Sequence, residues 1–135
     1  LSALIDEVQK TAETMRSEPS LARMGSALAV GADDLRTAMQ LVLEQGSDPE
    51  TGPDAVQAYA TPLLNLAGHV LCAWQMGNAA LHATSALQQG SNEPFYLAKL
   101  SSANFVITQW LPVGRAQRAV IEAGMQCLSD FELTP

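Results

Sequence analysis

Residues 55–92 read AVQAYATPLLNLAGHVLCAWQMGNAALHATSALQQGSN, and this stretch contains no Asp, Glu, Lys or Arg. So long a run without charge is either a membrane span or a helix that its neighbours cover on most sides. Polar side chains interrupt the apolar residues, and no segment approaches the ~20 apolar residues that a span needs. We therefore predict a long helix that other helices cover. The interrupting residues are Gln57, Asn65, His69, Gln75, Asn78, His82 and Gln88.

Small residues and two helix-breaking residues are expected to shape this central helix. Pro62 is predicted to kink the helix or to mark its true start, because proline lacks the N–H that a helix interior needs. Gly90 is predicted to end it. The small residues let neighbouring helices approach closely, and they are Ala67, Gly68, Ala73, Gly77, Ala79 and Ala80.

Apolar residues at steps of three and four predict three further helices. They cover residues 1–17, about 19–45, and a last segment that begins near Asn92, bends near Pro112 and ends around Ser129. The inward face of the last helix is predicted to hold Leu97, Leu100, Ile107 and Leu111, with Phe95 and Phe105 beside it and Val113, Ala116, Val120 and Cys127 continuing it.

Polar residues between these segments supply candidate helix caps. Ser17 is expected to cap the second helix, and Gly46 to end it in a left-handed conformation. Two helix-start signals then overlap, namely Ser47 with Glu50 as a capping box, and the segment 51–54 with its Pro and Asp. The connections are therefore short.

Four helices with short connections predict an all-α fold, an up-down-up-down four-helix bundle. Its two N-terminal helices are short to medium, and the two later helices are long and proline-kinked. Residues 1–135 form one domain. The predicted core contains Leu28, Leu35, Leu64, Val70, Trp74, Leu100 and Ile107.

The composition restricts the partners that the domain can have. Of the 135 residues, 47% are apolar and 16% charged, and the net charge is −7. Nucleic acids and anionic membranes need a basic face, so both are disfavoured as partners. Cys72 and Cys127 are too few and too far apart for a disulfide framework, and we expect two reduced, buried thiols in a cytoplasmic protein. The start at Leu1, without Met, suggests a piece of a longer chain.

No pattern of residues predicts catalysis, a metal site or a phosphate-binding loop. His69 and His82 are 13 residues apart and point in different directions on a straight helix, and no metal-binding His pair is present. Trp74 and Trp110 lie on apolar stripes and are interpreted as core or interface anchors. Lys99 is expected to pair with a carboxylate at a packing interface or, alternatively, to contact an anionic ligand. We predict no catalytic, cofactor-binding or metal residues.

Four stretches together resemble a known family. They are residues 17–28 (SEPSLARMGSAL), 59–74 (YATPLLNLAGHVLCAW), 95–100 (FYLAKL) and 110–112 (WLP). In this order and spacing they are similar to the accessory C-terminal helical domain of a bacterial subset of acyl-CoA dehydrogenases. The resemblance covers nearly the whole chain, with Pro62 as a departure from it.

The resemblance implies a parent enzyme that uses FAD to oxidise an acyl-CoA thioester to its 2,3-enoyl form, within fatty acid metabolism. The catalytic glutamate and most FAD contacts lie upstream in such enzymes, so no catalytic or FAD-binding residue is assigned here. The domain is then expected to pack on the dehydrogenase body or across a homo-oligomer interface. Gly68 would allow close approach beside Trp74, and Phe95 and Tyr96 would staple the fourth helix to its neighbour. The packing and interface candidates are Gly68, His69, Trp74, Phe95, Tyr96, Lys99 and Trp110.

Two other kinds of protein remain open. One is a free-standing helical interaction or dimerisation module without an enzyme. The other is a bundle that binds a small ligand in a pocket along the uncharged helix of residues 55–92, where a cavity beside His69 and Asn65 would favour it. The uncharged helices also predict that some uncharged surface stays exposed, so we expect the chain to self-associate when the dehydrogenase body is missing.

Overall fold

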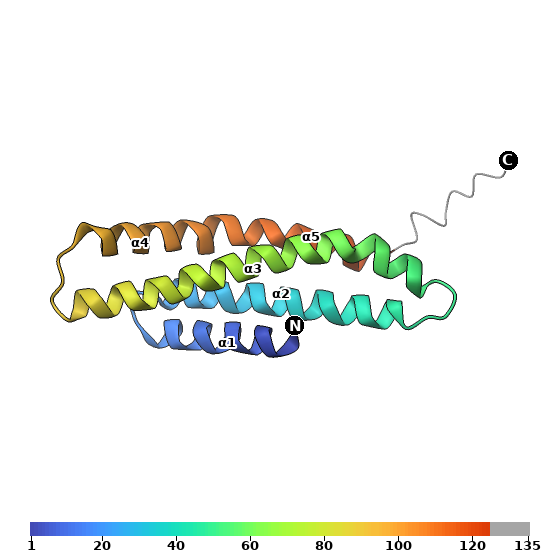
Figure 1. Cartoon of the computed structure of the whole chain (residues 1–135), viewed down its shortest axis with the longest axis horizontal. Helices are drawn as coiled ribbons and strands as arrows, with labels where there is room; N and C mark the ends of the chain where they lie inside the picture. The colour runs from blue at the N-terminus through green and yellow to red at the C-terminus, as the bar shows by residue number, and fades with distance from the viewer. Residues whose placement is uncertain (125–135) are drawn as a thin grey trace.

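The computed structural model describes residues 1–124 as four antiparallel helical segments, and this part contains no strand. Figure 1 shows that the segments run in opposite directions one after another, which confirms the predicted bundle of four helices. The fourth segment is interrupted. The elements are α1 (Ser2–Ser17), α2 (Ala22–Gly46), α3 (Gly52–Gln88), α4 (Pro94–Phe105), a π-helical turn (Val106–Trp110, the π-turn), a 3-10 turn (Leu111–Gly114) and α5 (Arg115–Ala123).

The start of α3 uses one of the two predicted signals. The helix begins at Gly52, with Pro53 in its first turn, as the segment 51–54 predicted. The capping box was wrong, because the Asp48 carboxylate accepts the backbone N–H groups of Glu50 (2.8 Å) and Thr51 (3.1 Å). The N–H groups of Thr51 and Glu50 hold the pKa of Asp48 below its ordinary value.

Two predicted helix ends have different outcomes. Gly90, at φ 94°, follows the end of α3 at Gln88, as predicted. Gly46 is still part of α2 and does not have a positive φ, so the predicted left-handed terminator was wrong. Ser17 does not cap α2 either, because its hydroxyl donates to the Glu13 carbonyl one turn back in α1.

The predicted bend near Pro112 is a local change of helix type. Pro112 has no N–H to donate, so the regular hydrogen-bond ladder is interrupted there, and the π-turn and 3-10 turn take up the interruption. The helix α3 continues through Pro62, which therefore does not mark its start. Gly124, at φ 76°, follows α5. The predicted end around Ser129 lies outside the described residues, as does Cys127.

The core lies between α2 and α3, with α1 packed on one side and α4–α5 on the other (Figure 1). Leu28, Leu35, Val70 and Ile107 are fully buried, as predicted. Trp74 and Leu100 are only partly buried. Trp74 instead donates its indole N–H to the Thr11 hydroxyl (2.8 Å), a polar link between α3 and α1.

Leu64 was wrongly placed in the core, since it is 73% exposed. Leu64 shares its face of α3 with Gly68, Cys72 and Gln75, which follow at steps of four, four and three. All three are exposed as well. Leu64 therefore lies on the face of α3 that the neighbouring helices leave uncovered.

The face predicted for the end of the fourth segment was also wrong. Val113 and Val120 are 59% and 53% exposed, while Leu111 and Ile121 are buried. A π-helical turn holds more residues per turn than an α-helix and so rotates the helix that follows. Leu111 is buried as predicted, but spacing rules that assume a continuous α-helix select the wrong face from Val113 onward. Leu97, predicted to face inward on α4, is likewise exposed.

The helices α1 and α2 approach each other closely at Gly25, whereas Gly68 is not a point of close approach. A Cβ on Gly25 would lie 2.7 Å from the Ala12 carbonyl oxygen and the Arg16 amide nitrogen of α1, whereas a Cβ on Gly68 would meet no atom within 4 Å. The predicted close packing at Gly68 was therefore wrong, because Gly68 faces away from the neighbouring helices.

One buried carboxylate joins α2 to α5. Asp34 is 5% exposed and accepts hydrogen bonds from Arg115 Nε (3.0 Å) and Arg118 Nη1 (2.7 Å). Arg118 also donates to Glu122, and the carboxylates of Asp34 and Glu122 raise its pKa. This cluster fixes α5 after the irregular turns.

Candidate association surface

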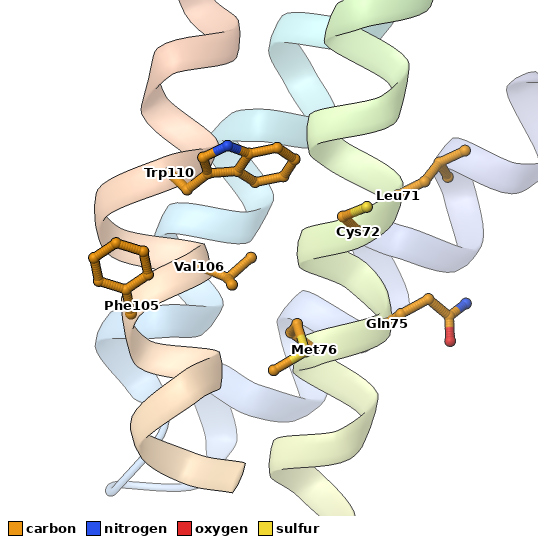
Figure 2. A pocket seen from close by; sticks show the side chains of 7 residues that line it. All are labelled: Leu71, Cys72, Gln75, Met76, Phe105, Val106 and Trp110. Carbon is orange, nitrogen blue, oxygen red and sulfur yellow. The ribbon is translucent and has the colours of Figure 1, made fainter. Parts of the chain in front are cut away.

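An apolar groove lies between α3 and the junction of α4 with the π-turn. Its volume is about 650 Å³. In Figure 2, Met76 and Val106 point toward each other across the groove, and the Trp110 ring extends over one end of it toward α3. The lining residues are Leu71, Cys72, Gln75, Met76, Phe105, Val106 and Trp110.

The π-turn positions Trp110 against α3. The indole ring stacks on His69, with ring centroids 4.1 Å apart and an interplanar angle of 21°. His69 Nδ1 lies 2.8 Å from the carbonyl oxygen of Asn65, and a carbonyl only accepts, so Nδ1 carries a proton and the ring orientation is fixed. Two predicted interface residues, His69 and Trp110, are thus brought together, and Trp110 remains 36% exposed.

Exposed apolar side chains continue from the edge of the groove. Phe105, which lines the groove, is 63% exposed and stands at the outer edge of α4 in Figure 2. Val113 follows on the 3-10 turn and is 59% exposed. We call the groove together with Phe105 and Val113 the outer face. Water-exposed aromatic and branched apolar side chains beside an apolar groove are typical of a surface that another molecule covers.

The outer face is almost without charge. Residues 55–92 carry none, and between residues 94 and 114 Lys99 is the sole charged residue. Its ammonium lies 5.5 Å from the centre of the Phe95 ring, within cation–π distance. Lys99 forms no ion pair within residues 1–124, so the expected carboxylate partner is not found there.

The predicted staple at the start of α4 was wrong. Phe95 is 58% exposed and contacts Tyr96 edge-on, with centroids 5.6 Å apart, within the same helix. Cys72 was expected to be buried, but it is exposed in the groove. Both corrections enlarge the exposed apolar surface of α3 and α4.

The part of the chain that the structure describes shows no group of three or more His, Cys, Asp or Glu side chains that could hold a metal ion. The groove does not match the pyrophosphate of FAD, because neither Lys nor Arg is among its lining residues to balance the two negative charges. The two arginines of α5 already bind Asp34.

Two features of this region were missed from the sequence. Asp34 looked like one more polar residue of an amphipathic helix, although it occupies a core-facing position between Gly31 and Leu35. The π-turn has no sequence signal apart from the Pro112 that follows it. Both features decide which side chains reach the outer face.

The fold and the outer face define a class: an all-helical bundle with an uncharged apolar groove on one face. The chain belongs to the family described as acetyl-CoA dehydrogenase C-terminal like, whose model matches residues 4–132. This confirms the resemblance found in the sequence motifs. Neither the curated proteins nor the solved structures contain a match to the chain. Within residues 1–124, every helix is too short or too polar to cross a membrane.

Proposed function

We propose that this chain is the C-terminal accessory helical domain of a flavin-dependent acyl-CoA dehydrogenase. The domain serves packing or subunit association. The catalytic body, which these residues do not include, binds FAD and oxidises acyl-CoA to 2,3-enoyl-CoA in cytoplasmic fatty acid metabolism. The observation that carries the proposal is the uncharged outer face in a member of this family.

The side chains of the outer face favour an association role over a catalytic role. Its side chains are aromatic, aliphatic, thiol and amide groups, and none of them is paired with a base or an acid that would activate it. A helical domain alone in water usually carries charged residues on its exposed faces. The absence of charge along residues 55–92 is explained if another protein surface covers this side.

The ligand-binding alternative has less support. That alternative placed a pocket along α3, where the groove does lie, and looked for a cavity beside His69 and Asn65. The Trp110 ring lies against His69 instead, and Asn65 is exposed to solvent. A free-standing interaction module remains the second candidate, since it would use the same outer face.

An antiserum raised against the chain separates these two functions. Applied to a denatured lysate of the source organism, it is expected to detect a band much heavier than 14.3 kDa, and the native form of that protein should carry flavin absorbance. A band at 14.3 kDa would show a free-standing module and contradict the proposal.

The purified chain itself is expected to be colourless and inactive. Because the groove does not match the pyrophosphate of FAD and has no catalytic base among its lining residues, incubation with FAD followed by gel filtration should leave no visible absorbance in the protein peak. Acyl-CoA oxidation with an artificial electron acceptor should stay at the buffer rate. Stoichiometric FAD bound to the chain would contradict the assignment of flavin chemistry to a separate body.

A further inference from the structure

We infer that the outer face binds a second copy of this chain across a two-fold axis, with Phe105 of each copy inserted into the groove of the other. This inference names the partner for the association role and to that extent rests on the proposed function.

Shape is the first argument for a second copy. The face carries an apolar groove of about 650 Å³, and Phe105, one of the residues that line it, is an aromatic ring left 63% exposed at its outer edge. A two-fold interface uses one patch twice, so it needs a patch that complements itself. An exposed apolar ring and an apolar groove on the same face satisfy this requirement.

Charge is the second argument. The chain carries a net charge of −7, so two copies repel each other at most orientations. On α1 and α2 the exposed acidic residues include Asp6, Glu7 and Asp33. The outer face brings together only uncharged side chains, with Lys99 beside them as a cation. Among the described surfaces, this orientation minimises like-charge contact.

Area is the third argument. Residues 94–114 are about 30 Å long, and a face two helices wide measures about 20 Å across, which gives about 600 Å² per copy. Stable specific interfaces bury about 1,200–2,000 Å² in total, so this face reaches the lower limit. The expected dimer is therefore reversible, with dissociation in the micromolar range.

The test compares two substitutions of exposed apolar residues. Phe105→Asp places a charge in the proposed interface, and Leu43→Asp places the same charge on α2, where Leu43 is 65% exposed. Circular dichroism checks that both variants fold. Phe105→Asp is expected to raise the dimer dissociation constant about 100-fold, and Leu43→Asp to leave it within about threefold.

The rate at which Cys72 reacts with a maleimide reports directly on whether the outer face is covered. In a Cys127→Ser background, Cys72 is the one thiol, and it is exposed in the groove of the single copy. Its reaction with a maleimide should slow about tenfold when the protein concentration rises through the dissociation constant. In the Phe105→Asp background the rate should not depend on concentration.

Three results would overturn the inference: a monomeric wild-type chain, a dimer that tolerates Phe105→Asp, or a Cys72 reaction rate that is independent of concentration in a dimer. If the purified chain is a monomer and the antiserum detects a full-length dehydrogenase, the inference fails. The outer face is then assigned to the catalytic body, and the proposed function stands. If the purified chain is a dimer and the antiserum detects a band at 14.3 kDa, the result supports the interface and contradicts the dehydrogenase role.

Discussion

Replacing Gly25 with alanine will lower the free energy of unfolding by about 2–3 kcal/mol. The new Cβ would lie 2.7 Å from backbone atoms of Ala12 and Arg16, which cannot move aside as a flexible side chain can. The helices α1 and α2 must therefore separate, and their buried contacts around Ile5 and Leu28 loosen. Urea denaturation followed by circular dichroism measures the loss.

Gly68→Ala is the matched control, since it makes the same chemical change on α3. Nothing lies within 4 Å of the new Cβ, and alanine favours a helix interior over glycine by about 0.5–1 kcal/mol. This variant should be more stable than the wild type. Equal destabilisation by both substitutions would contradict the helix packing described here.

Removing both arginines that hold Asp34 will destabilise the domain by about 3 kcal/mol. In the double variant Arg115→Met, Arg118→Met, the Asp34 carboxylate, which is 5% exposed in the wild type, loses its two cationic donors. A buried charge that has lost its partners is more costly than an exposed one. Thermal and urea denaturation of the double variant measure this loss.

Two controls separate the buried charge from the lost side chains. Asp34→Asn removes the buried charge, and the arginines, which are 60% and 31% exposed, remain solvated. Its loss should stay near 1–2 kcal/mol. Adding Asp34→Leu to the double variant should recover most of the stability, because the stranded charge is gone. A triple variant as unstable as the double would show that Asp34 is not the cause.

The helices could be predicted because their signals are local. Apolar residues at steps of three and four defined each segment, and Pro53 and Gly90 marked ends that the structure confirms. The fold class follows from the number of segments and their short connections. None of these inferences depends on contacts between residues distant in the sequence.

The errors concern information that is not local. Leu64 is exposed, together with Gly68 and Cys72, because the neighbouring helices leave that face of α3 uncovered, which spacing along α3 does not reveal. Val113 and Val120 are exposed because the π-turn rotates the last segment. Asp34 meets Arg115 and Arg118 across 81 and 84 residues of sequence. In each case a tertiary contact or a change of helix type decides the environment of the side chain.

The corrections also strengthen the functional argument. Residues assigned to the core by their spacing, such as Val113, turn out to be exposed apolar side chains, and so does the predicted staple residue Phe95. The exposed apolar surface is therefore larger than the absence of charge alone implied. An association surface explains why these positions are apolar although the bundle does not bury them.

Sedimentation equilibrium of the purified chain, from micromolar to millimolar concentration, tests most directly whether the outer face is an association surface. We predict reversible self-association, with the average mass rising from 14.3 kDa toward twice that value. A single species of 14.3 kDa at every concentration would contradict self-association through the outer face.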